Sequence, residues 1–241
     1  MTRTLAVIPA RYAAQRFPGK PLALLWGKPV LRHVWERARE AAGLDAIVVA
    51  TDDARIAAAA RAWGAAVEMT RAECASGTDR AAEVAQRHPE VQLVVNLQGD
   101  EPELDAASVA RLVAGMNAEP DVGMATLAHP AADRAELASE HVVKLEVDAA
   151  GFALYFTRQW PPARRAGGEI LRHVGVYGFT RELLLQFAAW PAGQEERRER
   201  LEQLRAVERG VRIKVYMSDR AATGIDTPAQ LAALEARGPR S

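Results

Sequence analysis

The sequence predicts an α/β fold with a central, mostly parallel mixed sheet that is flanked by helices. Short runs that are apolar on both faces alternate with longer stretches of helical spacing, which is typical of buried strands joined by amphipathic helices. Repetition of strand, helix and strand implies right-handed crossovers and a parallel sheet. In the second half the pattern changes to strands of alternating polarity, which makes the sheet mixed.

The first half of the chain supplies most of this sheet. Each expected strand is a short apolar run closed by a polar or turn residue, and each expected helix shows helical spacing. The strands are expected at residues 5–10, 46–52, 65–70, 93–99 and 122–130. The helices are expected at residues 29–43, 53–64, 77–89 and 105–119.

The second half begins with a hairpin. Residues 142–158 read as two alternating strands around the turn Asp148-Ala149-Ala150-Gly151. A loop rich in Pro, Arg and Gly follows at residues 160–169. The remaining strands are expected at 170–179 and 212–218, and the remaining helices at 180–190, at 195–210 and after Pro228. We expect a single domain over residues 1–241, with an insertion at about 130–210.

Composition excludes several classes of protein. With 241 residues, 49% of them apolar, the chain can bury a large core, which excludes a disordered or fibrous protein. Its 31 basic and 31 acidic residues cancel, so no global field favours nucleic acid or a membrane as a partner. Cys74 is the only cysteine, and no apolar run approaches the length of a membrane span. These features predict a soluble, cytoplasmic protein.

The loop after the first strand carries only positive charge. Arg11, Arg16 and Lys20 surround Pro18-Gly19, a turn at which backbone N–H groups can approach a ligand. Ligands gather at the carboxyl ends of parallel strands, so we expect a phosphate cradle here. The loop matches neither the Walker motif nor the dinucleotide fingerprint. The alternative is a solvated loop that happens to be basic.

Two acidic residues also follow strand-like segments. Asp100 comes just after the fourth strand, and Asp226 precedes a helix that Thr227 already caps. Carboxylates at this edge suit Mg²⁺, so Asp100 and Asp226 form a candidate metal pair beside the basic loop. In the alternative, Asp100, Glu101 and Glu103 are solubilising rim residues or complement a helix dipole.

These segments resemble a known family. "IPARYAAQRFPGKPL", "ATDD", "SGTDR", "VVNLQGDEP", "MATL", "RHVGVYGF", "LEQLR" and "GIDTPAQL" are similar in order and spacing to the 3-deoxy-D-manno-octulosonate (Kdo) cytidylyltransferases, over essentially the whole chain. The resemblance implies a nucleotide-diphospho-sugar transferase-like fold whose insertion serves sugar binding and dimerisation. It also implies a Mg²⁺-dependent homodimer that transfers CMP from CTP to Kdo, a step toward lipopolysaccharide.

The resemblance also implies site residues. The catalytic group would be Lys20, Arg11, Asp100 and Asp226, with Asp100 and Asp226 on the metal. The nucleotide would be bound by Arg11, Arg16, Lys20, Ser76, Gly77, Thr78, Arg80 and Gln98. The acidic sugar would be bound by Arg158, His173, Tyr177, Glu202 and Gln203.

Several of these residues have simpler explanations. Thr78 could cap its own helix. His173 and Tyr177, four positions apart in a strand, could merely face one side of the sheet. Glu202 could be an ordinary surface charge of a helix.

The chain departs from the family pattern at two places. Ala14-Gln15 replaces a usual pair of small hydroxyl residues, and the loop at 160–168 is short and lacks an acidic pair. The sugar could therefore be an amino derivative of Kdo or an acylneuraminate. A regulatory subunit that binds nucleotide sugars without catalysis is a further alternative, which the retained cations and carboxylates disfavour.

Overall fold

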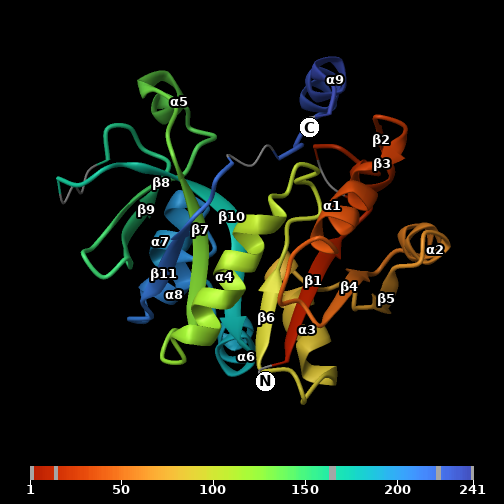
Figure 1. The fold of residues 1–241 in the computed structure, drawn as a ribbon, viewed down its shortest axis with the longest axis horizontal. Helices are drawn as coiled ribbons and strands as arrows, with labels where there is room; N and C mark the ends of the chain where they lie inside the picture. The colour runs from red at the N-terminus through yellow and green to blue at the C-terminus, as the bar shows by residue number, and fades with distance from the viewer. Residues whose placement is uncertain (1–2, 14–15, 163–166, 221–223, 240–241) are drawn as a thin grey trace.

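The predicted α/β architecture is confirmed by the computed structural model, which describes residues 3–13, 16–162, 167–220 and 224–239. One sheet has the strand order β11-β7-β10-β6-β1-β4-β5 (Figure 1). Its strands are β1 (Thr4–Ala10), β4 (Ala46–Thr51), β5 (Ala66–Met69), β6 (Leu93–Asn96), β7 (Met124–Pro130), β10 (Leu171–Thr180) and β11 (Ile213–Met217). The departure at Ala14-Gln15 and the middle of the 160–169 loop lie outside the described residues.

The sheet is mostly parallel, as predicted. β1 pairs in parallel with β4 and β6, β4 with β5, and β11 with β7. β10 lies between β6 and β7 and runs antiparallel to both. The predicted hairpin is also present: β8 (Lys144–Val147) and β9 (Ala153–Thr157) pair antiparallel, and β8 joins the edge of β10. The small strands β2 (Leu24–Leu25) and β3 (Lys28–Pro29) form a separate hairpin.

The helices are α1 (Val30–Ala38), α2 (Ala54–Ala62), α3 (Gly77–Arg87), α4 (Ala106–Ala118), α5 (Arg134–Ala138), α6 (Arg181–Ala189), α7 (Gln194–Glu199), α8 (Leu204–Val207) and α9 (Pro228–Arg237), with a 3₁₀ turn η1 at Lys20–Leu22. Helices α1, α3, α4 and α6 pack on the sheet, whereas α9 lies apart from it. One helix prediction is wrong. The segment 195–210 is not continuous, because Arg200 adopts a left-handed backbone (φ 55°) that ends α7. The chain turns there so that Leu201 and Leu204 pack into the core.

Two apolar clusters form the core, one on each face of the sheet. On one face, β1 side chains such as Ile8 pack with α1 and α4 side chains, including Leu31 and Leu112. On the other face, Val7 packs with side chains from α3 and α6, including Val84 and Phe187. This alternation along β1 is what a strand covered on both faces requires. Both faces of this strand are therefore buried.

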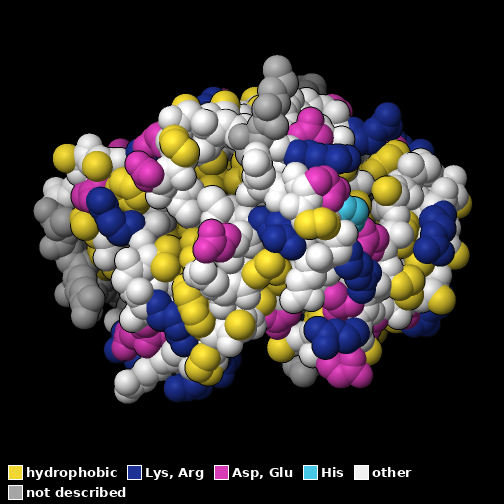
Figure 2. All heavy atoms as spheres, turned by 90° about the horizontal axis from the view of Figure 1, so that it is seen from below, with side chains coloured by type: hydrophobic (Ala, Val, Ile, Leu, Met, Phe, Trp, Pro, Cys, Tyr) yellow, Lys and Arg dark blue, Asp and Glu magenta, His cyan; other side chains and the backbone are white. Residues whose placement is uncertain are grey.

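The surface carries both charges. Figure 2 shows the molecule from the end at which β1 begins, and basic and acidic side chains are interspersed there. Within the described ranges, no helix combines the length and the apolar character that crossing a membrane would need.

Candidate active site

A cavity of about 1440 Å³ lies where the candidate ligand groups come together. It includes Arg11, directly after β1, and Asp100, after β6, as expected for the carboxyl edge of a parallel sheet. The predicted site residues that line it are Arg11, Arg16, Lys20, Ser76, Gly77, Arg80, Gln98, Asp100, Arg158 and Asp226. The predicted site residues that do not line it are Thr78, His173, Tyr177, Glu202 and Gln203.

The predicted turn at Pro18-Gly19 is present and aims the loop back at the sheet. Gly19 has a left-handed backbone (φ 75°), and its N–H donates to the carbonyl of Tyr12 at 2.8 Å. A Cβ at this position would stand 3.1 Å from the Tyr12 ring, so both conformation and space favour glycine. Lys20 follows at the start of η1 and is directed into the cavity.

Lys20 is the centre of the site. Its ammonium lies 2.5 Å from Asp100 Oδ2 and 3.9 Å from Asp226 Oδ1. It also donates to the carbonyl of Ile225 at 2.7 Å. With only 13% of its side chain exposed, Lys20 is not a solvating surface lysine. One cation therefore holds together two carboxylates that are far apart in the sequence.

The two carboxylates are also linked through the backbone. The N–H of Ile225 donates to the carbonyl of Asp100 at 2.9 Å, which places Asp226 beside the end of β6. Two carboxylates and a carbonyl oxygen around one cation are donors of the kind that Mg²⁺ selects. Among the described residues, no three or more His, Cys, Asp or Glu side chains are grouped so that they could hold a metal ion by themselves. Phosphate oxygens and water would have to complete the shell, which is common for Mg²⁺.

The two arginines of the loop differ in their contacts. Arg16 forms an exposed ion pair with Asp226, with 3.0 Å between Nη2 and Oδ1. Arg11 is exposed, lines the cavity and has no hydrogen-bond or ion-pair partner among the residues that the structure describes. Arg11 is thus a cation available to an incoming anion.

Gly99 allows the chain to pass close to β1 before Asp100. A Cβ on Gly99 would stand 2.7 Å from the carbonyl oxygen of Pro9, a distance that neither backbone could accommodate without moving. The glycine therefore lets Gln98 and Asp100 enter the same cavity as the loop after β1.

The acidic residues after Asp100 are not solubilising rim residues. The carboxylate of Glu103 is 8% exposed and lies 2.5 Å from the guanidinium of Arg237 on α9. Glu101 is buried, and burial together with the Asp100 charge raises its pKa to about 8.

Two polar contacts near its C-terminal end attach helix α9 to other parts of the fold. The Arg237–Glu103 pair joins it to the segment that carries Asp100, and Glu235 accepts a 2.6 Å hydrogen bond from the N–H of Trp26. Leu234 packs with Leu25, Val30 and Ile225 in a small separate apolar cluster. The helix thereby bridges the basic-loop side and the Asp100 side of the cavity.

The predicted cap at Thr227 is confirmed. Its Oγ1 accepts from the N–H of Gln230 at 3.3 Å, and Gln230 Oε1 accepts from the N–H groups of Asp226 and Thr227.

We expect Thr227→Ala to lower the free energy of unfolding by about 1 kcal/mol, because an N-cap is lost. Asp226→Asn should change the melting temperature little, since its ion pairs are partly exposed. Thermal unfolding of both variants tests this, and equal destabilisation would make Asp226 a structural residue.

At the start of α3, Ser76 and not Thr78 is the N-cap. Ser76 and Asp79 form a reciprocal capping box, so the helix-cap explanation of Thr78 is wrong. The Thr78 side chain is buried instead, where it donates to Glu202 Oε2 at 2.5 Å and accepts from Asn96 Nδ2 at 3.2 Å. Thr78 therefore connects α3 to Glu202, which is not an ordinary surface charge.

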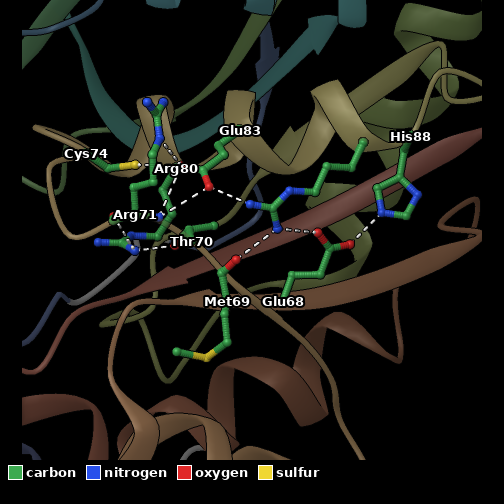
Figure 3. Close-up of polar contacts among 9 residues, drawn as sticks. Glu68, Met69, Thr70, Arg71, Cys74, Arg80, Glu83 and His88 are labelled. Atoms are coloured by element: carbon green, nitrogen blue, oxygen red, sulfur yellow. Dashed lines mark hydrogen bonds and ion pairs between the residues drawn. The ribbon is translucent and has the colours of Figure 1, made fainter.

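Arg80 is a buried cation in the cavity wall. Its side chain is 3% exposed and lies 3.1 Å from Asp52 Oδ1, with a further hydrogen bond to Thr70. Figure 3 shows the neighbouring network, in which Glu83 accepts from Arg71 and Cys74. These contacts fix α3 against the segment after β5, so the cavity wall around Arg80 is rigidly supported.

His173 and Tyr177 share one face of β10, outside the cavity lining. Their ring centroids are 5.4 Å apart, and the hydroxyl of Thr126 lies 2.9 Å from His173 Nε2. Burial lowers the pKa of His173 to about 3 and raises the pKa of Tyr177 well above its usual value. Both groups are therefore neutral at pH 7.

The neutral His173 makes stability dependent on pH. Its pKa in the folded chain lies below the ordinary 6.5, so the stability it contributes is complete above pH 6.5 and is lost as the pH falls toward 3. We expect the parent to lose about 2 kcal/mol of unfolding free energy from this group between pH 7 and pH 5, and His173→Gln to lack that loss. Denaturant titrations at both pH values measure the difference. His141→Gln, at an exposed position, is the control, and equal pH dependence in parent and His173→Gln would contradict the assignment.

Glu202 and Gln203 complete this region. Burial raises the pKa of Glu202. Gln203 is buried, and its Nε2 has no hydrogen-bond partner among the described residues. An unpaired buried amide is costly, so a ligand oxygen here would be favoured.

Several ionisable residues that the sequence patterns do not point to also line the cavity. They are Glu140, His141, Arg198, Glu199 and Arg200. The last three lie at the break between α7 and α8, within the segment 195–210 for which the sequence predicts one continuous helix. The signal that could have revealed them is the pair Leu201 and Leu204, whose burial requires the chain to turn.

Comparison with known proteins gives a consistent result. The model of a family described as "Cytidylyltransferase" matches residues 5–213. The chain is 52% identical, over the full length of both proteins, to a 3-deoxy-manno-octulosonate cytidylyltransferase of Anaeromyxobacter sp. strain Fw109-5. It is 46% identical to the enzyme of the same name from Syntrophotalea carbinolica, with 96% of each chain covered. A solved structure of CMP:2-keto-3-deoxy-manno-octonic acid synthetase complexed with CTP superimposes with a TM-score of 0.91, at 41% identity and 98% coverage of both chains.

Proposed function

The chain belongs to the family of 3-deoxy-manno-octulosonate cytidylyltransferases, and from this membership we propose how its cavity transfers CMP from CTP to Kdo. The products are CMP-Kdo and pyrophosphate, and the sugar nucleotide serves lipopolysaccharide synthesis. The observation that carries the assignment of residues is the convergence of Lys20, Asp100 and Asp226 at one point beside Arg11 and Arg16. Cations suit a triphosphate, and the carboxylates suit the metal that accompanies it.

Arg11, Arg16 and Lys20 would bind the triphosphate. Guanidinium groups form paired hydrogen bonds to phosphate oxygens, and the ammonium of Lys20 is a compact charge at the centre. Arg16 and Lys20 would exchange their present carboxylate partners for phosphate oxygens. Ser76, Gly77 and Gln98 line the same cavity and would contact the base and ribose, with Arg80 behind them.

Asp100 and Asp226 would hold Mg²⁺. The bound ion would supply Lewis-acid polarisation at the α-phosphate and neutralise charge on the leaving pyrophosphate. The roles of the protein groups are to orient the nucleotide and to stabilise developing charge.

The transfer itself is an in-line displacement. The anomeric 2-hydroxyl of the sugar attacks the α-phosphorus, the new O–P bond forms, and the bond from that phosphorus to the pyrophosphate oxygen breaks. The hydroxyl proton is released to solvent. Lys20 and Arg11 line this cavity, and in our proposal they would stabilise the negative charge that grows on the departing phosphates, which would favour the transition state over the ground state.

The sugar would lie toward Arg158. Its guanidinium suits the sugar carboxylate, and the neutral groups His173 and Tyr177 suit hydroxyls. The unpaired amide of Gln203 and the carboxyl of Glu202 are further partners for hydroxyls. These last four residues do not line the cavity, so sugar binding would require a small adjustment of its wall.

The decisive experiment measures pyrophosphate release by the purified protein with CTP, Mg²⁺ and Kdo. We expect release that depends on all three. Parallel reactions with N-acetylneuraminate and with an 8-amino derivative of Kdo test the two rival sugars. Absence of release with every sugar, despite CTP binding, would favour the regulatory subunit.

We also propose a cytoplasmic homodimer. CTP is made in the cytoplasm, and the resemblance to the family favours a dimer whose formation involves the insertion at about 130–210. Sedimentation equilibrium tests the dimer, for which a mass of twice 26.2 kDa is expected.

A further inference from the structure

Lys144 on β8 is a completely buried lysine. Its side chain is 0% exposed, and its ammonium donates to three backbone carbonyl oxygens. These belong to Ser139 at 2.8 Å, Val142 at 2.9 Å and Arg158 at 2.6 Å. A buried charge is costly unless hydrogen bonds replace its hydration, and here each of the three donors has an acceptor.

Glu199 at the end of α7 contacts Arg158, the residue whose carbonyl accepts from Lys144, at its backbone N–H. Its Oε2 accepts from the N–H of Arg158 at 3.0 Å and from the hydroxyl of Thr157 at 3.1 Å. Glu199 is 7% exposed. The backbone of Arg158 is therefore held at its N–H by a carboxylate and at its carbonyl by an ammonium. Hydrogen bonds to charged groups are stronger than those between neutral groups, so this backbone is firmly fixed.

The side chain of Arg158 is aligned by the same arrangement. Its Nη1 donates to the carbonyl of Glu140 at 3.1 Å and to that of His141 at 3.4 Å. Both carbonyls lie within the segment 139–142 that Lys144 anchors at its two ends. Arg158, Glu140 and His141 all line the cavity. Lys144 thus fixes the arginine and the carbonyls that orient its guanidinium.

We propose that Lys144 and Glu199 are positioning residues that fix Arg158 for recognition of the carboxylate of the acidic sugar. The inference rests on the proposed function and adds a device for substrate selection. Neither residue needs to touch the substrate. Both act through Arg158, because a guanidinium must be preorganised to bind a carboxylate through two parallel hydrogen bonds.

The experiment compares the sugar acid with its uncharged methyl ester. The variants are Lys144→Met, Glu199→Ala and Glu199→Gln, the last of which keeps an acceptor oxygen. For Lys144→Met and Glu199→Ala we expect the KM for Kdo to rise about tenfold or more, with the KM for CTP changed less than about twofold. In these two variants the preference for the acid over the ester should fall as the KM for Kdo rises. Glu199→Gln should recover part of the affinity for Kdo and part of the preference for the acid.

Two matched controls remove comparable groups elsewhere. Glu196→Gln lies on the same helix and loses an ion pair with Arg205, and Lys214→Met loses an ion pair with Glu119. We expect neither to change the preference for the acid. In Arg158→Met the preference should disappear, and adding Glu199→Ala to it should have no further effect, because the two changes act through one group.

Equal increases in both KM values, or an unchanged preference in Glu199→Ala, would overturn the inference. A further loss of preference in the double variant would overturn it as well. If Lys144→Met does not fold, the Glu199 pair and the double variant still decide the question. Failure of the proposed function is a separate result, since the parent protein itself would then release no pyrophosphate from CTP and Kdo.

Discussion

Asp100→Asn and Asp226→Asn are each expected to lower kcat by about a hundred- to a thousandfold while the fold is retained. Each change removes one negative charge from the oxygen set around Lys20, which we propose as the Mg²⁺ site. Loss of one group that stabilises the transition state costs about 3–4 kcal/mol. The shape of each side chain is nearly unchanged, so the effect is electrostatic.

Pyrophosphate release at saturating CTP, Kdo and Mg²⁺ measures this effect. Asp219→Asn is the control, because Asp219 is an acidic residue in an exposed ion pair with Arg111. It should leave kcat unchanged. Normal turnover in either site variant at saturating Mg²⁺ would show that the two carboxylates are not a metal pair.

Lys20→Met is expected to raise the KM for CTP and to lower kcat, each by about tenfold or more, with a much smaller effect on the KM for Kdo. The ammonium is mostly buried and contacts both carboxylates, so its removal takes a charge from the point where phosphate charge develops. Lys20→Arg should not restore activity, because a planar guanidinium cannot replace a compact ammonium beside Asp100 and the Ile225 carbonyl.

Steady-state kinetics with each substrate varied in turn separates the two effects. Lys28→Met is the matched control, since Lys28 pairs with Glu36 and has 45% of its side chain exposed. Exposed pairs contribute little, and CTP kinetics should be unaffected there. Unchanged CTP kinetics in Lys20→Met would exclude the basic loop as the triphosphate site.

The strands could be predicted because burial on both faces leaves a direct signature in the sequence. "LAVIPA" and the "LVV" that Asn96 closes are continuous apolar runs, and both form central strands. The place of β10 could not be predicted in this way. Apolar periodicity says that a strand is buried, but it does not say that β10 lies antiparallel between β6 and β7.

The break at Arg200 was missed for a related reason. "EERRERLEQLRAVERG" has helical composition throughout, and a single left-handed residue changes no local propensity. Tertiary packing of Leu201 and Leu204 decides the conformation there. The place of Glu199 beside Arg158 depends on this break, so the predicted continuous helix gave no sign of it.

The convergence of candidate residues on one cavity could be predicted best where those residues are close in the sequence. Arg11, Arg16 and Lys20 occur within ten residues, and a turn with glycine at its centre joins them. The Lys144 arrangement is invisible in the sequence, because its acceptors are backbone carbonyls that any residue supplies.

Helix α9 has a consequence for how the protein loses activity. Its only fully buried side chain is Leu234, so releasing the helix exposes little apolar surface compared with unfolding the sheet. Release would nevertheless break the Glu235 and Arg237 contacts and free the adjoining segment that carries Asp226. Because we propose Asp226 as a metal ligand, we expect heating to lower catalysis through local, reversible opening of α9 at a temperature where the sheet remains intact.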